Sequence, residues 1–380
     1  MKIVFAVHTY YPERNGVQAV TQYLAEGLAR RQHDVLIITE KKELRDEEFA
    51  GGVLIKRISV KKKGFSFIGD KKKYLEYIQK YDPDVFVCVC TQSWTFDWIA
   101  DEIETFSCTK ILYTHGFSSL QKKYPLVTDL VCGRFRAFHY HYYWKRYYDK
   151  AWRIINKFDI ETHLSENNIS VWYSKEHGIL NGVVMENAVE DIFFEMNTEQ
   201  QTENIQYIYI ANYDDNKNQK MVLNSFLKAK VLNGKLILAG AGEKQYFEEL
   251  KNSWEDQKQN YPLANVEILY NISRDQIYKL YQQSQVFVCG SRKEQYPIML
   301  CEAAAAGLAI ISTKVGHAET MPGIETVDSE TEMIDKIKQI SEQKNERKQK
   351  SEQLRAYAKE HYRIKGKIDQ FLEIINNSRR

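Results

Sequence analysis

The chain has 380 residues, which is long for a single hydrophobic core, so we expect two domains. With 43% hydrophobic and 27% charged residues, its composition is that of a globular protein and excludes a largely disordered one. A formal net charge of +2 is too small to indicate nucleic-acid binding, and no nucleic-acid partner is expected.

The cysteines predict free thiols, because none forms a Cys-x-x-Cys pair and no His/Cys cluster has the spacing of a zinc site. A strand is expected directly after Met1, and no stretch reaches about 18 apolar residues. We therefore expect no bound metal, no signal peptide and no membrane-spanning helix. The expected location is the cytoplasm, with at most a peripheral attachment to the inner face of the cell membrane.

The first half of the chain predicts a parallel sheet covered by helices. Between its first two strands, four apolar residues follow one another at helical spacings: Val17, Val20, Leu24 and Leu28. Because strands alternate with helices, they should pair in parallel. The expected strands are residues 3–7, 35–38, 85–90 and 110–114.

A D-x-D sequence, Asp82-Pro83-Asp84, precedes the third of these strands. Two carboxylates at this spacing can bind a divalent metal ion. Here the proline disfavours continuation of the preceding helix, so the sequence favours a turn.

Two segments of this half are strongly basic. Residues 56–80 and 121–157 each contain 9 Lys and Arg against 2 Asp and Glu. Within the second, residues 134–153 are rich in aromatic side chains, and Phe135, Phe138 and Tyr142 share one helical face. Two interpretations stay open for this run. It is either an amphipathic helix at an anionic membrane or beside a lipid-linked acceptor, or a helix buried against the N-terminal sheet.

The pattern of strands and helices begins again near residue 205. A polar stretch at residues 188–204 separates the two halves. We therefore expect an N-terminal Rossmann-like domain at 1–187, a second at 188–360, and a helix at 361–380 that packs back on the first domain. The expected strands are residues 207–211, 236–239, 266–269, 286–289 and 309–312.

Two glutamates eight positions apart, Glu294 and Glu302, are the most informative residues of the second half. Apolar runs at 286–289 and 308–312 flank them, which predicts a strand, a loop, a helix and a strand. The first acid falls in the loop and the second on the helix. This spacing can place one carboxylate at each end of a polar ligand, while the helix start offers N–H groups to an anion.

With these glutamates, the chain resembles the retaining GT-B glycosyltransferases of the family-4 type, also described as glycosyl transferases group 1. The resemblance covers nearly the whole chain and depends on several elements in a fixed order. They are Pro12 and Gly16 after the first strand, His115-Gly116 at a strand end, Lys217-Asn218 before a helix, Leu-Ala-Gly-Ala-Gly-Glu at 238–243, and Glu294 and Glu302 followed by a small-residue helix and Gly307.

The resemblance implies an α/β fold of the GT-B type, with two Rossmann-like domains facing each other across a cleft. It also implies a nucleotide-sugar donor, with UDP favoured, and no cofactor or metal. Glu302 would accept hydrogen bonds from the ribose hydroxyls, and Glu294 would face the donor sugar. The residues Gln295, Tyr296, Pro297 and Ile298 would bind the donor at the helix start.

Three further residues receive roles by the same resemblance. Lys217 would neutralise the charge of the diphosphate, which grows as the leaving group departs. His115 would act near the donor sugar, at the carboxyl end of its strand. Gly16 would let the backbone approach the phosphate or the acceptor, because it has no Cβ.

Several positions depart from the family pattern. The family commonly has a phosphate-binding arginine where this chain has Asn212, so one cationic phosphate contact is either missing or comes from another residue, such as Lys220 or Arg292. The first loop has Asn15-Gly16 in place of two glycines, and Gln295 and Tyr296 replace a common glycine and phenylalanine. We therefore include Asn212 among the expected donor-binding residues, with a neutral amide where the family has a cation.

The expected function is sugar transfer to a hydroxyl of a saccharide or lipid-linked saccharide, of the hexosyl or N-acetylhexosaminyl class, in bacterial surface polysaccharide synthesis. An anionic membrane surface is a further possible partner. Two alternatives stay open: a UDP-sugar epimerase, and a non-catalytic GT-B scaffold or partner subunit. The missing arginine is the feature that supports the scaffold.

Overall fold

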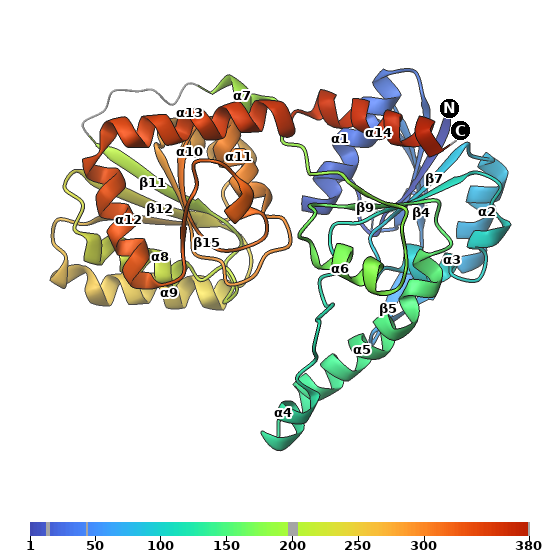
Figure 1. Ribbon diagram of the computed structural model, residues 1–380, viewed down its shortest axis with the longest axis horizontal. Helices are drawn as coiled ribbons and strands as arrows, with labels where there is room; N and C mark the ends of the chain where they lie inside the picture. The colour runs from blue at the N-terminus through green and yellow to red at the C-terminus, as the bar shows by residue number, and fades with distance from the viewer. Residues whose placement is uncertain (13–15, 43–44, 197–203, 379–380) are drawn as a thin grey trace. The chain divides into compact units, whose positions relative to one another are not determined.

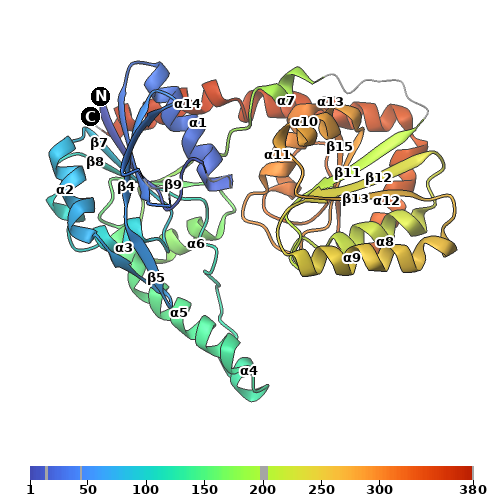
Figure 2. The same ribbon diagram turned by 180° about the vertical axis from the view of Figure 1, so that it is seen from behind.

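The computed structural model describes residues 1–12, 16–42, 45–196 and 204–378 (Figures 1 and 2). The chain divides into two compact units. Unit 1 comprises Met1–Asn187 and Ile364–Arg380, and unit 2 comprises Ala188–Arg363. The boundaries expected from the sequence fall after residues 187 and 360. Of the expected polar boundary stretch, residues 197–203 lie outside the described residues.

Unit 1 contains an eight-stranded sheet with the order β10-β9-β8-β7-β1-β2-β4-β3, in which only β3 and β4 pair antiparallel. A separate antiparallel hairpin joins β5 to β6. The strands are β1 (Lys2–Ala6), β2 (Asp34–Glu40), β3 (Glu47–Ala50), β4 (Val53–Ile58), β5 (Val60–Lys63), β6 (Ser66–Gly69), β7 (Val85–Val89), β8 (Thr109–Tyr113), β9 (Ile160–His163) and β10 (Gly182–Val184). The helices are α1 (Gly16–Arg30), α2 (Lys71–Tyr81), α3 (Trp94–Ile99), α4 (Leu126–Val131), α5 (Phe135–Ile155), α6 (Ile169–Glu176) and α14 (Ile364–Ser378), with a 3-10 turn η1 (Ile103–Thr105).

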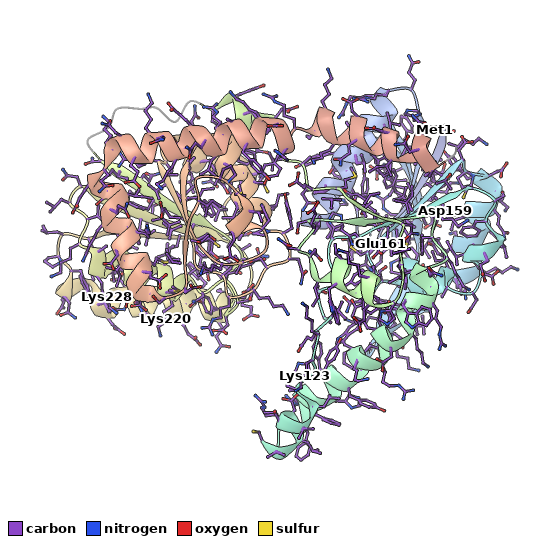
Figure 3. The ribbon with its side chains drawn as sticks, viewed as in Figure 1. Met1, Lys123, Asp159, Glu161, Lys220 and Lys228 are labelled. Carbon is purple, nitrogen blue, oxygen red and sulfur yellow. The ribbon has the colours of Figure 1, made fainter. Side chains whose placement is uncertain are left out.

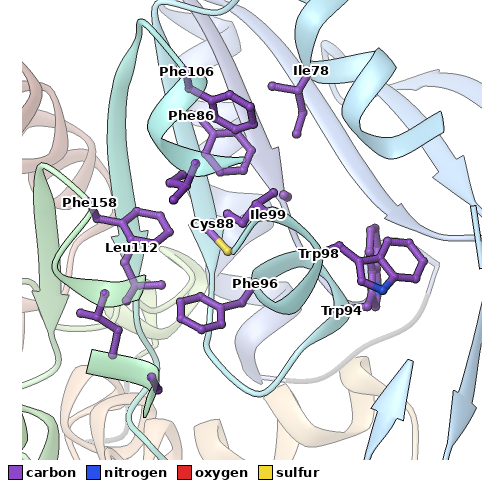
Figure 4. Close-up of a cluster of buried hydrophobic side chains, with 14 of the residues drawn as sticks. Ile78, Phe86, Cys88, Trp94, Phe96, Trp98, Ile99, Phe106, Leu112 and Phe158 are labelled. Carbon is purple, nitrogen blue, oxygen red and sulfur yellow. The ribbon is translucent and has the colours of Figure 1, made fainter. Parts of the chain in front are cut away.

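Alternate residues of the central strands of unit 1 face opposite sides of the sheet. On one side Val4 and Ala6 of β1 join a buried cluster with residues of α2, α3 and α5 (Figure 4). On the other side Phe5 meets Phe371 of α14, with ring centroids 6.0 Å apart. A Cβ on Gly27 of α1 would lie 2.1 Å from the side chain of Ile368, so the glycine lets α14 pack closely on α1.

Unit 2 contains a six-stranded parallel sheet with the order β13-β12-β11-β14-β15-β16. All strands expected from the sequence are present, which confirms the α/β fold with two Rossmann-like sheets. The strands are β11 (Ile205–Ile210), β12 (Gly234–Gly240), β13 (Asn265–Tyr270), β14 (Val286–Cys289), β15 (Ala309–Thr313) and β16 (Glu325–Val327). The helices are α7 (Ile192–Glu195), α8 (Gln219–Ala229), α9 (Lys244–Gln257), α10 (Arg274–Gln283), α11 (Ile298–Ala306), α12 (Glu330–Glu342) and α13 (Lys344–His361), with 3-10 turns η2 (Lys258–Asn260) and η3 (Ala318–Thr320).

The Asp82-Pro83-Asp84 sequence serves the fold of unit 1. Asp82 ends α2 in the left-handed conformation, with a φ of 50°. The Asp84 carboxylate accepts a hydrogen bond of 2.8 Å from the backbone N–H of Lys2, at the start of β1. The segment is thus a turn that connects α2 to the sheet.

Candidate functional site

The strand order of unit 2 reverses direction between β11 and β14. In open parallel sheets, ligands bind outside the carboxyl ends of the strands at such a reversal. The segment after β11 carries Asn212 and Lys217, and the segment after β14 carries residues 294–298. The topology therefore brings sequence-predicted site residues from two segments to the same edge of one sheet.

Lys217 and Glu294 form an ion pair at this edge. Their side chains are 19% and 13% exposed, so the two charges attract each other more strongly than they would in open water. Backbone contacts join the two segments beside the pair. The Arg292 N–H donates to the carbonyl of Asn216 at 2.7 Å, and the Asn216 side chain donates to the carbonyl of Lys293 at 2.9 Å. These contacts thus fix the two backbone segments that carry the lysine and the carboxylate.

Two residues next to the sheet allow the segments to approach so closely. The Tyr209 hydroxyl donates to the Lys217 carbonyl at 2.9 Å and shares a hydrogen bond of 2.8 Å with the Ser291 hydroxyl. A Cβ on Gly290 would lie 3.0 Å from the carbonyl oxygen of Asn218, so a larger residue would push the segments apart.

Glu302 lies on α11, a helix that begins directly after Pro297 and is buried on nearly all sides. The glutamate is only 6% exposed, so its charge has to be compensated inside the protein. Arg274 Nη2 donates to its Oε1 at 2.6 Å, and the Tyr281 hydroxyl donates to its Oε2 at 3.1 Å. Burial raises the pKa of Glu302, while the guanidinium and the hydroxyl oppose that rise.

Arg274 connects Glu302 to a second carboxylate. It donates to Glu190 Oε2 through Nη2 at 2.6 Å and through Nε at 3.1 Å. Its guanidinium also lies over the rings of Phe193 and Tyr278, 5.2 Å and 4.9 Å from their centroids. Because both oxygens of Glu302 already accept bonds from the protein, a ribose hydroxyl would have to use their remaining lone pairs.

Residues 295–297 pack against the loop that follows β15. The rings of Tyr296 and His317 stack with centroids 3.6 Å apart. A Cβ on Gly316, whose φ is +57°, would lie 2.5 Å from the Pro297 side chain. Burial lowers the pKa of His317 to about 3, so its ring is neutral at physiological pH. This packing sets the position of the first turn of α11. The Leu300 N–H donates to the Pro297 carbonyl at 3.0 Å, whereas the N–H groups of Ile298 and Met299 have no carbonyl partner within the helix.

Asn212 is exposed beside a loop that two glycines hold close to it. A Cβ on Gly240 would lie 1.8 Å from the carbonyl oxygen of Ala211, and one on Gly242 would lie 3.3 Å from the Asn212 Cβ. The neutral Asn212 side chain brings no positive charge. Exposed cations on the segments after β11 and β14 include Lys220, at the start of α8 (Figure 3), Arg292 and Lys293.

The two remaining predicted site residues belong to unit 1. His115 follows β8, and burial lowers its pKa to about 4. Its Nε2 is buried and has no hydrogen-bond partner within the described part of the chain, which marks it as an atom that a ligand can satisfy. Gly16 is the first residue of α1, and a Cβ there would meet nothing within 4 Å. Asn15, beside it, lies outside the described residues.

Sequence reasoning did not identify Arg274, Tyr281 or His317. A usable signal exists for two of them. Arg274 follows a capping-box serine, Ser273, that starts a helix directly after β13, and His317 follows a glycine after β15. Both therefore come after strands of the same parallel sheet and emerge at the same edge as Glu294.

Two family models match the chain, one in each unit. "Glycosyltransferase Family 4" matches residues 14–166, and "Glycosyl transferases group 1" matches residues 191–361. The chain therefore belongs to the GT-B glycosyltransferases of the family-4 type, also described as glycosyl transferases group 1. No curated protein sequence matches it.

Solved structures of similar fold cover nearly the whole chain. A glycosyltransferase from Rickettsia africae has 16% identity and a TM-score of 0.73, with 99% of this chain and 98% of that one covered. Anabaena HepE in complex with UDP-glucose has 15% identity and a TM-score of 0.71, with 99% and 100% covered. WaaG, a glycosyltransferase involved in lipopolysaccharide biosynthesis, has 15% identity and a TM-score of 0.62, with 98% and 99% covered.

Proposed function

We propose that this protein is a retaining glycosyltransferase that moves a hexosyl or N-acetylhexosaminyl group from a UDP-sugar to a hydroxyl of a saccharide or lipid-linked saccharide. The observation that supports this most directly is the Lys217–Glu294 pair at the reversal of the unit 2 sheet. The UDP-glucose complex of HepE supports the choice of donor, and WaaG supports a setting in bacterial surface polysaccharide synthesis at the inner face of the cell membrane.

Each donor group has a proposed partner in unit 2. Glu302 accepts hydrogen bonds from the ribose hydroxyls, and Glu294 accepts them from hydroxyls of the sugar. The first-turn amides of α11, from Ile298 onward, bind phosphate or sugar oxygens. When the donor is bound, Lys217 faces diphosphate oxygens as well as Glu294, so it can stabilise the charge that the leaving group gains.

In the proposed reaction the acceptor oxygen bonds to the anomeric carbon on the face from which UDP departs. The bond between that carbon and the diphosphate oxygen breaks, and the leaving diphosphate takes the acceptor's proton. Lys217 and the start of α11 supply the stabilisation that a metal ion gives in other glycosyltransferases, so we expect activity in the presence of a chelator. His115 stays neutral and is assigned a hydrogen bond to the donor sugar.

A direct test measures UDP release from UDP-sugars with candidate saccharide acceptors. Lys217→Met and Glu294→Gln should each lower kcat by about 10²–10³ through lost transition-state stabilisation. Lys228→Met and Glu330→Gln are matched controls, because that ion pair is in the same unit but more exposed, and their activity should equal that of the wild type (Figure 3).

The same assay separates the alternatives. Isomerisation of the UDP-sugar without an acceptor would identify an epimerase, and binding without turnover would identify a scaffold. Near-normal transfer by both Lys217→Met and Glu294→Gln would refute the roles assigned to the pair.

A further inference from the structure

The α4–α5 hairpin of unit 1 exposes an unusual number of apolar side chains at its tip. Helix α4 and the first half of α5 extend away from the unit 1 sheet in both views (Figures 1 and 2). Four apolar residues of this tip are between 53% and 80% exposed: Val127, Leu130, Val131 and Phe135. We call these four residues the apolar tip. Contiguous exposed apolar surface of this kind marks an interaction site.

One buried carboxylate explains why the apolar tip faces outward. Asp129 of α4 is 1% exposed, and its oxygens lie 2.9 Å from Arg134 Nη2 and 2.6 Å from His141 Nδ1 of α5. Since Asp129 faces α5, residues 127, 130 and 131, which share another face of this short helix, are turned away from it. The exposure is therefore built into the hairpin by specific contacts.

The second half of α5 is anchored in the core of unit 1. Tyr148, Ala151 and Ile155 belong to the buried cluster, and the Tyr147 hydroxyl donates to Asp97 at 3.1 Å. The interpretation of residues 134–153 as a buried helix therefore holds for the second half of α5. The first half begins at Phe135 of the apolar tip and extends away from the sheet, so for it the membrane interpretation stays a hypothesis.

Basic side chains lie behind the apolar tip, on α5 and on the segments beside it (Figure 1). The β5–β6 hairpin is held against α5 by Phe65, whose ring stacks on Tyr143 at 4.2 Å. It carries three exposed lysines in a row and no acidic residue. Lys123 lies on the segment that leads to α4 (Figure 3). We call the exposed basic side chains the basic collar: Lys61, Lys62, Lys63, Lys122, Lys123, Arg136 and Arg146.

We propose that the apolar tip inserts into the headgroup region of an anionic lipid bilayer, while the basic collar contacts lipid phosphates. An apolar end with cations behind it matches the layering of such a surface, whose acyl chains lie deeper than its phosphates. A second copy of the chain would bring like charges together around the tip, which disfavours self-association through this face. Among the described residues no helix is long and apolar enough to cross a membrane, so this contact would be peripheral.

Vesicle sedimentation tests this surface without any sugar nucleotide, so its result is separate from that of the activity assay. The full chain should bind vesicles that contain phosphatidylglycerol, bind pure phosphatidylcholine at least tenfold more weakly, and dissociate at about 1 M salt, where the Debye length is ~3 Å. Lys61→Gln, Lys62→Gln and Lys63→Gln together should weaken binding roughly 100-fold, at about fivefold per lysine.

Combined Val127→Ser, Val131→Ser and Phe135→Ser should weaken binding at least tenfold at unchanged thermal stability. Leu232→Ser with Leu263→Ser is the matched control, because these leucines are 79% and 84% exposed in unit 2, and it should bind like the wild type. Equal binding of the tip variant and the wild type would overturn the proposal. Sedimentation velocity gives a second possible contradiction. If the wild type forms dimers and the tip variant does not, the apolar tip binds a second copy of the chain, and the proposal is wrong.

Discussion

Glu294 and Glu302 are neutralised by different cations in different surroundings. Glu294 meets a flexible lysine in a loop, where a phosphate can compete for the ammonium. Glu302 is buried on a helix and meets a guanidinium that two carboxylates and two aromatic rings hold in place. The first pair is therefore suited to exchange partners during a reaction, and the second to stay fixed.

Arg274→Gln should destabilise unit 2 by about 3 kcal/mol, because it leaves a buried carboxylate without its cation. Donor affinity should fall as well, since Glu302 would lose its fixed position. Chemical denaturation and the KM for the UDP-sugar measure the two effects. Arg292→Gln is a control for stability alone, because its side chain is 58% exposed and its loss should change stability by less than about 0.5 kcal/mol. Unchanged stability of Arg274→Gln would show that the hydrogen bond from Tyr281 alone is enough to compensate the buried carboxylate of Glu302.

At the scale of elements, the site is made by segments that follow parallel strands, and glycines decide how closely they pack. Gly240 lets its own segment pack against the segment after β11, because a Cβ at this position would overlap the Ala211 carbonyl. Gly16 has no such neighbour among the described residues, so its glycine is not explained by packing.

These two glycines give opposite expectations for substitution by alanine. Gly240→Ala should destabilise unit 2 by about 1–3 kcal/mol, as overpacking does. Gly16→Ala should stay within about 1 kcal/mol of the wild type, or stabilise α1. If a ligand approaches the backbone at Gly16, the kcat/KM of Gly16→Ala should fall more than tenfold even though its stability is unchanged. Thermal melting and transfer kinetics measure both, and full activity of Gly16→Ala would remove Gly16 from the site.

The sequence patterns predict the central strands well and the outer ones poorly. Strands such as β7 and β14 are continuous apolar runs, as expected for buried parallel strands. Strand β9 reads Ile-Glu-Thr-His, yet all four residues are buried. Burial raises the pKa of Glu161 (Figure 3) to about 7, and a hydrogen bond of 2.6 Å that its carboxyl accepts from the Ser174 hydroxyl opposes that rise. No apolar run or alternation in the sequence marks this segment as a buried strand.

The site follows the same division. Glu294, Glu302 and Lys217 could be selected from the sequence, because they stand at fixed distances from apolar runs. Arg274 and His317 carry a weaker signal, which places each of them after a strand but does not place them beside Glu302 and Tyr296. That proximity depends on the order of β13 and β15 in the sheet. Chain order does not determine that spatial order.

At the scale of the whole molecule, the tryptophans are distributed unequally between the two units, so their fluorescence can report the unfolding of one unit. Trp254 is the one tryptophan of unit 2, and the other five belong to unit 1. Because the proposed UDP contacts all lie in unit 2, UDP at about 100 times its Kd should stabilise that unit by about 2.7 kcal/mol.

Calorimetry should show this shift with UDP and a smaller one with GDP or ADP. In Trp254→Phe, melting followed by tryptophan fluorescence reports unit 1 alone and should not respond to UDP. A fluorescence transition that moves together with the calorimetric one would show that the units unfold as one.

Helix α14 completes unit 1 only after the chain has passed through all of unit 2. A ribosome therefore makes the docking surface on α1 and β1 long before the helix that covers it. Until then Phe5 lacks its ring partner Phe371, and Gly27 lacks Ile368. We therefore expect unit 2 to fold before unit 1 is complete, so that the domain that begins the chain reaches its native state later, against the usual N-terminal-first order.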